Sequence, residues 1–454
     1  MSRTQAIARA REAATAPLTA GLVLTVAAVA FEALAVPTVM PAVVGELGDL
    51  DAYGWMFSAF FLANVVASVA AGQGIDRLGP LPPFAAGMGL FALGLGAAGS
   101  ATGTPTLIAA RAIQGLGGGA LWAVVYAVVA RAYPADARPR MLAVLSTAWV
   151  VPGLVGPALA GVAADHLGWR VIFVGLIPLL GVATALAVPA LRRVPRAVPT
   201  EADTARRVAA AVVLAAGVVL LLVGLERRGP LLPCLAGGVL LALAGLRPLM
   251  PPGVFTLAPG LPAAIVVVGL VCVAFFGAEP GVPLLATALL GQSATAAGLA
   301  LTGATLTWTA GAWLQARLVR TRSRRALVAS GCAVIALGVA AAAASAAGSA
   351  SIAFVWGAWS LAGLGMGLTH ATVSLIVLEE APEGGEGTAS AAMQLANVIG
   401  AALGAGVLGA MVATANDTRE GLVRGFAAVG AAAVLATAAA RRLPASPARS
   451  SDAA

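Results

Sequence analysis

Three charged residues lie inside long apolar runs of this 454-residue sequence: Glu32, Arg111 and Glu279. If the runs cross a bilayer, a charge near its centre costs roughly 3 kcal/mol or more, so these side chains should face the interior and find partners. A carboxyl group there can bind and release a proton, and a nearby guanidinium favours its charged form. We expect Glu32 to bind and release the proton that drives the protein's work. Arg111 would tune the pKa of Glu32, because arginine itself stays charged.

Glu279 is a second acid at a similar place in the other half of the chain. It could share the proton or bind a cationic substrate. The alternative is that the intramembrane charges form a purely structural ion pair, because buried pairs can also serve packing and specificity.

The composition indicates the class of protein that must position these charges. Apolar residues make up 60% and charged residues 10% of the chain, whereas a soluble domain carries roughly 25% charged residues. We therefore expect an all-α polytopic membrane protein, because the runs lack the alternation of a transmembrane barrel. Fourteen runs are about long enough to span a bilayer; they lie at 18–43, 52–74, 81–101, 104–130, 139–164, 169–189, 208–225, 229–247, 260–285, 294–318, 324–345, 350–378, 387–414 and 420–441.

The arginines orient these spans. All 27 basic residues are arginine, and with a cytoplasmic N-terminus 21 of them fall in inner segments and five in outer segments, with Arg111 inside a span. Inner loops of membrane proteins are enriched in this way. We expect a multi-pass protein of the bacterial inner membrane with both termini in the cytoplasm. The net charge of +8 therefore indicates membrane topology, and no nucleic-acid partner is expected.

An internal repeat predicts how the spans are grouped. GLGGG at 115–119 recurs as GLGMG at 363–367, and the same spacing of 248 relates Pro134 to Pro382 and Gly161 to Gly409. Parallel repeats of this kind are typical of secondary transporters with a site between the halves. We predict two parallel six-helix bundles, at 1–190 and 260–454. A linker at 191–259 adds two peripheral helices that take no part in coupling.

The stretch GQGIDRLG at 72–79 fits the pattern G-x-x-x-D-R-x-G between the second and third spans. It resembles the loop signature of the major facilitator superfamily. We expect a tight turn that uses Gly72 and Gly79. Asp76 and Arg77 would then hold the cytoplasmic side shut, with Arg317 equivalent in the second half. A plain solvated turn is the alternative. Four residues without charge, PLPP at 80–83, follow where the family has more basic residues.

Further stretches carry the same resemblance. LIAARAIQGLGGGA at 107–120 resembles the family's fourth-span motif, with Arg111 as its intramembrane arginine, followed by Gln114. PGLVGPALAG at 152–161 resembles the fifth-span motif of the exporters, and GWRVIF at 168–173 resembles the start of the sixth span. Fourteen spans with two central extra helices resemble the drug/proton antiporter branch.

The fifth-span motif has physical consequences of its own. Gly153, Gly156 and Gly161 form a stripe of small residues that permits close helix contact. Pro157 removes a backbone hydrogen bond and can kink the helix. The sequence leaves open whether the stripe serves packing alone or a role specific to exporters.

Polar and aromatic side chains within the spans are candidates for a substrate cavity: Gln114, Trp308, Trp359, His370, Gln394 and Asn397. We expect His370 to form a hydrogen bond between helices rather than to bind a substrate or ion. Gln394 and Asn397 could line the cavity or pack between helices. The tryptophans could form aromatic walls, although lipid-facing tryptophan is more ordinary.

We therefore expect a proton-coupled exporter of amphipathic or hydrophobic small molecules that works by alternating access as a monomer in membrane lipid. A lipid or glycolipid exporter of the same fold is the alternative, and a lipid-modifying membrane enzyme is disfavoured because paired histidines and acidic metal-binding clusters are absent from the sequence. No G-x-x-x-x-G-K-[ST] loop for ATP is present. Cys234, Cys272 and Cys332 have no metal-like spacing, so no metal or other cofactor is expected.

Overall fold

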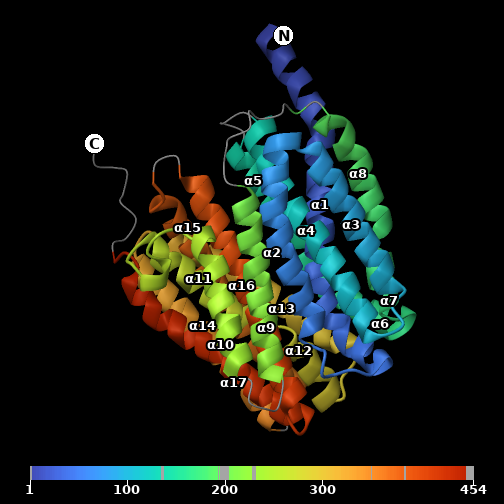
Figure 1. The fold of residues 1–454 in the computed structure, drawn as a ribbon, viewed down its shortest axis with the longest axis vertical. Helices are drawn as coiled ribbons and strands as arrows, with labels where there is room; N and C mark the ends of the chain where they lie inside the picture. Colours follow the sequence, from blue (N-terminus) through green and yellow to red (C-terminus); the bar gives the residue numbers. More distant parts are fainter. Residues whose placement is uncertain are drawn as a thin grey trace.

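A computed structural model describes residues 3–133, 138–192, 194, 204–226, 232–348, 350–382 and 385–445. These residues fold almost entirely into helices, which Figure 1 shows as a bundle of long, roughly parallel rods. The first half of the chain forms α1 (Arg3–Leu47), α2 (Trp55–Leu78), α3 (Leu81–Gly99), α4 (Thr104–Ala132), α5 (Arg138–Thr147), α6 (Val150–Leu167), α7 (Arg170–Val174) and α8 (Ile177–Leu191).

Two helices, α9 (Thr204–Glu226) and α10 (Leu232–Leu246), follow the first half. Short 3-10 turns at Arg247–Leu249 and Val254–Thr256 then lead into the second half. Its helices are α11 (Leu261–Ala278), α12 (Gly281–Leu284), the π-helical segment η3 (Leu285–Leu289), α13 (Ala294–Leu318), α14 (Arg324–Ala347), α15 (Ile352–Glu379), α16 (Glu386–Thr414) and α17 (Thr418–Ala439).

Within the described ranges, twelve helical segments are long and apolar enough to cross a membrane. Two further helices complete the fourteen predicted runs. The first, α10, is shorter, and the second, α13, has 25 residues but is made more polar by five threonines, a glutamine and an arginine. The prediction of an all-α polytopic membrane protein is confirmed.

The helix boundaries follow the sequence repeat closely. α4 begins at Thr104 and α15 at Ile352, which is 248 residues later. The same spacing separates the starts of α5 and α16, at Arg138 and Glu386. A single spacing therefore relates consecutive helices of the two halves, as expected for two copies of one helical unit.

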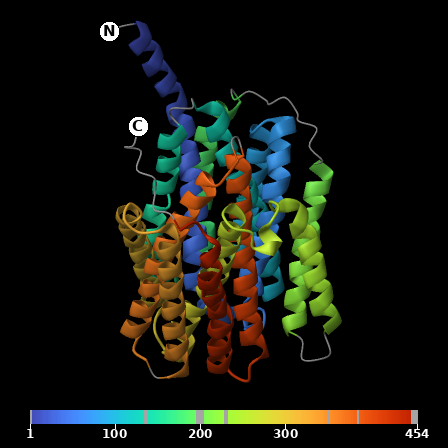
Figure 2. The same cartoon turned by 90° about the vertical axis from the view of Figure 1, so that its left-hand side faces the viewer.

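The two halves lie side by side, and α9 and α10 stand together at one flank of the molecule (Figure 2). α9 packs against both α2 and α16, while α10 packs mainly against α9. Leu214, Val218 and Leu222 of α9 are buried there against Leu62 and Ile399. The inserted pair is thus peripheral, and α9 covers a line along which the two halves meet.

The stretch 72–79 differs from the prediction of a glycine-built loop. α2 continues through Asp76 and Arg77 and ends at Leu78, so Gly72 is a helical residue and not part of a turn. Only Gly79 has the left-handed conformation of a turn, with φ of 82°. The reason is that one residue in this conformation, followed by Pro80 as the N-cap of α3, is enough to reverse the chain.

Candidate functional site

Glu32 and Arg111 form a buried ion pair in the interior of the first half. Glu32 lies in the middle of α1 and is 1% exposed, and Arg111 lies in the second turn of α4 and is 3% exposed. Nη1 of Arg111 donates to Oε1 of Glu32. The same nitrogen donates to Oε1 of Gln114 at 3.1 Å, and Nε donates to the carbonyl oxygen of Met56 at 3.0 Å. The guanidinium is therefore held by α1, α2 and α4 together.

The pair is enclosed but not fully satisfied. The ring of Phe60 lies 4.5 Å from the guanidinium carbon of Arg111, which adds a cation–π contact. Oε2 of Glu32 and Nε2 of Gln114 are buried without a hydrogen-bond partner. Most buried polar atoms in proteins have hydrogen-bond partners, so two atoms without partners beside an ion pair require an explanation. Chemically, Oε2 of Glu32 is an open position for a proton.

Glu279 is the corresponding acid of the second half. It caps the C-terminal end of α11 and is 9% exposed. Among the residues that the structure describes, no side chain forms an ion pair or hydrogen bond with its carboxyl group. Glu32 and Glu279 thus differ sharply in their surroundings.

Four aromatic rings cluster on the second half, and two of them, Phe275 and Phe276, lie on α11 one turn before Glu279. Phe275 stacks on Trp359 with ring centroids 4.8 Å apart and meets Trp308 edge-on at 5.5 Å. Phe276 also contacts Trp308, at 6.1 Å. Trp359 is fully buried, and its indole nitrogen has no hydrogen-bond partner. The rings come from α11, α13 and α15 and form one aromatic wall.

A small polar group continues this wall towards the other end of α15. The ring nitrogen Nε2 of His370 lies 3.5 Å from Nδ2 of Asn397, which joins α15 to α16. Asn397 also donates to Oε1 of Gln394 at 3.2 Å and accepts from Sγ of Cys272 at 3.3 Å. Trp308 contacts the His370 ring at 5.9 Å. Four of the six cavity candidates, namely Trp308, His370, Gln394 and Asn397, therefore come together on the second half.

The residues proposed as a gate lie elsewhere, at the end of the molecule where α1 begins and α17 ends, which is the upper end in Figure 1. Arg77 and Arg317 are both exposed there, in the last turns of α2 and α13. The backbone of Asp76 belongs to α2, but its side chain lies outside the described part of the structure. Arg77 thus lies at the opposite end of α2 from Met56, whose carbonyl oxygen binds Arg111 of the ion pair.

The small-residue stripe of α6 faces α13 in the other half. A Cβ atom added to Gly153 would lie 2.5 Å from Cγ2 of Thr305, and one added to Gly161 would lie 2.5 Å from the carbonyl oxygen of Ala294. Between them, the carbonyl oxygen of Pro157 approaches Gly298. Gly156 instead faces Phe31 of α1. The stripe is therefore a contact surface between the halves.

Asp165 and Tyr53 form hydrogen bonds between the halves that were not predicted from the sequence. Asp165, one turn beyond Gly161 on α6, accepts hydrogen bonds from the backbone nitrogens of Ala294 and Thr295 at 3.0 and 2.9 Å and from the Thr295 hydroxyl at 2.6 Å. The Tyr53 hydroxyl donates to the carbonyl oxygen of Pro280 at 2.7 Å. The position of Asp165, four residues after a stripe glycine, was the signal that could have found its bonds to α13.

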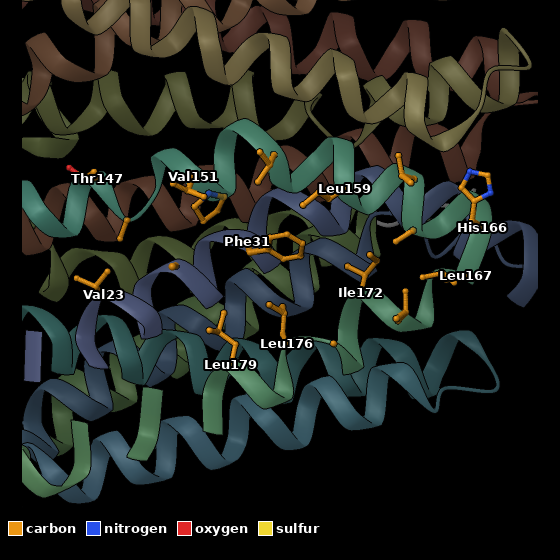
Figure 3. Close-up of a pocket in the computed structure, with 18 of the residues that line it drawn as sticks. Val23, Phe31, Thr147, Val151, Leu159, His166, Leu167, Ile172, Leu176 and Leu179 are labelled. Carbon is orange, nitrogen blue, oxygen red and sulfur yellow. The ribbon is translucent and has the colours of Figure 1, made fainter. Parts of the chain in front are cut away.

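A long apolar groove runs along the first half between α1, α6 and α8 (Figure 3). Its volume is about 1060 Å³. Phe31 points into its middle, Thr147 lies near one end and His166 at the other (Figure 3). Val155, Leu159 and Leu167 are exposed along its α6 wall. Apart from Thr147 and His166, the groove is lined by apolar residues, glycine and proline.

Comparisons with known proteins agree on one family. The model of the Major Facilitator Superfamily matches residues 22–405. A probable multidrug-efflux transporter of Mycobacterium tuberculosis is 27% identical over 436 residues, which cover 90% of this chain and 91% of that protein. Multidrug resistance protein 3 of Bacillus subtilis is 28% identical over 170 residues, covering 37% of this chain and 33% of that protein.

Solved structures show the same fold. An auto-inhibited peptide transporter of the POT family superposes with a TM-score of 0.70 at 17% identity, covering 95% of this chain and 98% of that one. A POT family transporter in complex with 5-aminolevulinic acid gives 0.65 at 13% identity, covering 92% and 94%.

Proposed function

The chain belongs to the Major Facilitator Superfamily of membrane transporters, and we propose that it is a proton-coupled exporter of amphipathic or hydrophobic small molecules. Two relatives that match 90% of its length are probable multidrug-efflux transporters, which supports export of small molecules. We further propose that it works as a monomer in the bacterial inner membrane with its upper end in the cytoplasm.

The observation that carries proton coupling is the buried pair of Glu32 and Arg111. The pair lies in a span, is almost fully buried, and leaves Oε2 of Glu32 without a partner. A nearby guanidinium stabilises the charged form of a buried carboxyl group. Without that contact, burial stabilises the protonated form. A small shift of α1 relative to α4 would therefore load or release a proton.

Alternating access would expose this pair to each side in turn. The hydrogen bonds of Tyr53 and Asp165 join the two halves near the lower end of the molecule, where α2 and α13 begin. This supports a state that opens towards the upper end. In the opposite state, Asp76, Arg77 and Arg317 would close the upper end, with units 1–190 and 260–454 rocking against each other.

The test uses purified Glu32→Gln protein in liposomes with an imposed pH gradient and an amphipathic dye. We expect dye binding to persist and proton-driven transport to be lost, because an amide cannot exchange the proton. Glu420→Gln is the matched control, since Glu420 also pairs with an arginine, Arg424, but on the surface of α17. Undiminished proton-driven transport in Glu32→Gln would contradict the proposal.

A lipid or glycolipid exporter is the second candidate, and the apolar groove favours it. Twenty residues separate Thr147 from Leu167 along its α5–α6 wall, which corresponds to about 30 Å of helix and thus to the thickness of a bilayer core. The groove lies on the face of α6 beside the contact with α13. A membrane-dissolved tail could follow it towards that contact.

Leu159→Trp, which narrows the groove, separates the two candidates. A lipid exporter should lose movement of a fluorescent lipid between leaflets, whereas a dye exporter that does not use the groove should keep dye transport. Leu337→Trp is the control, because Leu337 is also more than half exposed, on α14 and away from the groove. Equal lipid movement in both variants and the parent would exclude the groove as a path.

A further inference from the structure

A second cavity lies where the chain leaves the inserted pair of helices. Its lining residues all fall between Leu243 and Thr256, in the last turn of α10 and the two 3-10 turns that follow. Its volume is about 600 Å³, and pockets that bind small molecules usually have about 300–1,000 Å³. The cavity therefore belongs to the inserted segment and is separate from the candidate site between the halves.

The cavity lies at the upper end of the molecule, at the boundary of the apolar segment. The backbone nitrogen of Gly260, just after the cavity, donates to the carbonyl oxygen of Arg442, just after α17, at 3.3 Å. Figure 2 shows this end uppermost, with α9 and α10 at one flank. α10 contains no charged residue, and Arg247 is the first charge after it. Arg247 thus marks the level at which the lipid tails give way to headgroups.

An exposed apolar face of α10 leads to this arginine. Leu240 and Leu243 precede Arg247 by seven and four residues, so the three side chains lie on one side of the helix. Leu240 is 67% exposed, and Leu243, which lines the cavity, is also exposed. α10 packs mainly against α9. A hydrocarbon chain could therefore follow about 10 Å of this outer face and end at the cavity.

The charge of the cavity is positive. Arg247 is exposed and forms no hydrogen bond or ion pair with any residue that the structure describes, and none of the described lining residues is acidic. Arg207 is also exposed, in the first turn of α9, which runs antiparallel to α10 and contacts the turn of Arg247. A guanidinium donates two parallel hydrogen bonds to a phosphate group. The cavity is therefore complementary to an anion.

The wall of the cavity has a defined shape. Gly253 and Leu257 both have the left-handed conformation, with φ of 89° and 50°. The backbone nitrogen of Ala258 donates to the carbonyl oxygen of Gly253 at 3.0 Å, and that of Leu257 donates to Val254 at 3.2 Å. A left-handed residue other than glycine costs energy and persists only where its surroundings hold it. The cavity is thus formed in advance of any ligand.

We infer that this cavity binds the headgroup of an anionic phospholipid. Arg247 contacts the phosphate oxygens, and one acyl chain lies along Leu240 and Leu243. Basic pockets beside transmembrane helices recognise anionic headgroups in this way. No acid lines the described wall to receive the ammonium group of a zwitterionic lipid, so a headgroup with net negative charge fits better. The inference concerns the inserted segment and does not depend on the proposed export function.

The test measures which lipid lies beside α10. Ala244→Cys carries a bimane fluorophore, because Ala244 is exposed next to Leu243 but does not line the cavity. Cys234→Ser removes the cysteine that is only partly buried. In phosphatidylcholine vesicles, nitroxide-labelled phosphatidylglycerol should quench this fluorophore with about fivefold higher apparent affinity than nitroxide-labelled phosphatidylcholine. Arg247→Gln should make the two affinities equal.

The controls separate a local site from a general attraction to the positive end of the molecule. Arg320→Gln should keep the preference, because Arg320 is exposed just after α13 and does not line the cavity. If Arg247→Gln does not fold, Pro252→Glu adds an acid to the wall and should also abolish the preference. Inorganic phosphate should not displace the lipid when compared with sodium chloride of equal ionic strength, because it lacks the acyl chain.

Three results would overturn the inference. The first is an unchanged preference for phosphatidylglycerol in folded Arg247→Gln or Pro252→Glu protein. The second is an equal loss of preference in Arg320→Gln, which would indicate the overall charge of this end. The third is displacement by inorganic phosphate, which would make the cavity a site for free anions. Because the assay measures no transport, its failure would leave the proposed export function untouched.

Discussion

The two halves meet along two seams that the repeat makes equivalent but that the structure closes differently. In the α6–α13 seam, Gly161 contacts the start of α13, and in the α2–α16 seam, Gly409 contacts the start of α2 at Gly54. Gly161 and Gly409 are 248 residues apart, so they hold the same place in the repeat. Both seams therefore depend on a glycine that lets two backbones touch.

Beyond this shared contact, the seams differ. Asp165 closes the α6–α13 seam by capping α13 with three hydrogen bonds. Near the other seam, Tyr53 and Ser58 each donate one hydroxyl to a carbonyl oxygen of the second half, that of Pro280 or Ala402. Leu222 of α9 also covers Gly406 there. The hydrogen bonds of the Asp165 cap can break and form again as the first seam opens and closes. The second seam has a backbone contact that α9 covers, so it is better suited to stay together while the halves rotate.

This difference suggests that α6–α13 is the seam that opens and α2–α16 the one that guides the motion. Spin labels can measure each opening at the lower end. Leu167 and Gln292 are exposed on either side of the first seam, and Asp51 and Asn416 are exposed on either side of the second.

Gly409→Ala should have the largest effect. The added Cβ would lie 2.2 Å from Cα of Gly54, and neither backbone can move aside cheaply. Overpacking of this kind costs about 1–3 kcal/mol, so we expect a lower thermal transition and a longer Asp51–Asn416 label distance. Gly357→Ala is the control, because a Cβ there meets nothing within 4 Å. A normal transition temperature would show that the contact is looser than described.

Asp165→Ala should open the first seam without disturbing the second. Loss of a helix cap costs about 1 kcal/mol, so we expect the population with a long Leu167–Gln292 label distance to rise about fivefold. Asp417→Ala is the matched control, since Asp417 caps α17 within its own half. If both variants shift the label distance equally, the effect of the Asp165 cap is not specific to the seam.

Tyr53→Phe should have a smaller effect on the second seam. It removes a single hydroxyl-to-carbonyl hydrogen bond of 2.7 Å, for which about 1 kcal/mol is a usual contribution. Because the glycine contact and α9 remain, we expect a modest broadening of the Asp51–Asn416 distance distribution. Tyr126→Phe, at a half-exposed position, should leave it unchanged. A broadening as large as that of Gly409→Ala would refute the order of effects.

Ser58→Ala should have the smallest effect. The Ser58 hydroxyl donates to the Ala402 carbonyl oxygen at 3.0 Å, an oxygen in the interior of α16 and thus able to accept a backbone bond as well. We expect a change of less than about 1 kcal/mol in seam opening and no measurable change in either label distance. Ser100→Ala, whose hydroxyl bonds within its own helix, should behave alike.

The sequence by itself determined the class of the protein, its helices and the equivalence of its halves. Apolar runs and arginine positions are properties of single segments, and each segment must satisfy its backbone hydrogen bonds internally in a membrane. The spacing of 248 therefore predicted the starts of α15 and α16 from those of α4 and α5. Glu32, Arg111 and Glu279 were also recognisable, because a charge inside an apolar run is conspicuous without any structure.

Only the tertiary structure decided which side chains meet. Glu32 and Glu279 look alike in sequence, yet one pairs with Arg111 and the other has no ion-pair partner among the described residues. Asp165 carried no motif, and its role depends on the start of α13, 129 residues away. The helical end of α2 replaced the predicted loop, because glycine permits a turn but does not require one. Contacts between distant helices depend on how the halves pack, and local sequence does not encode that choice.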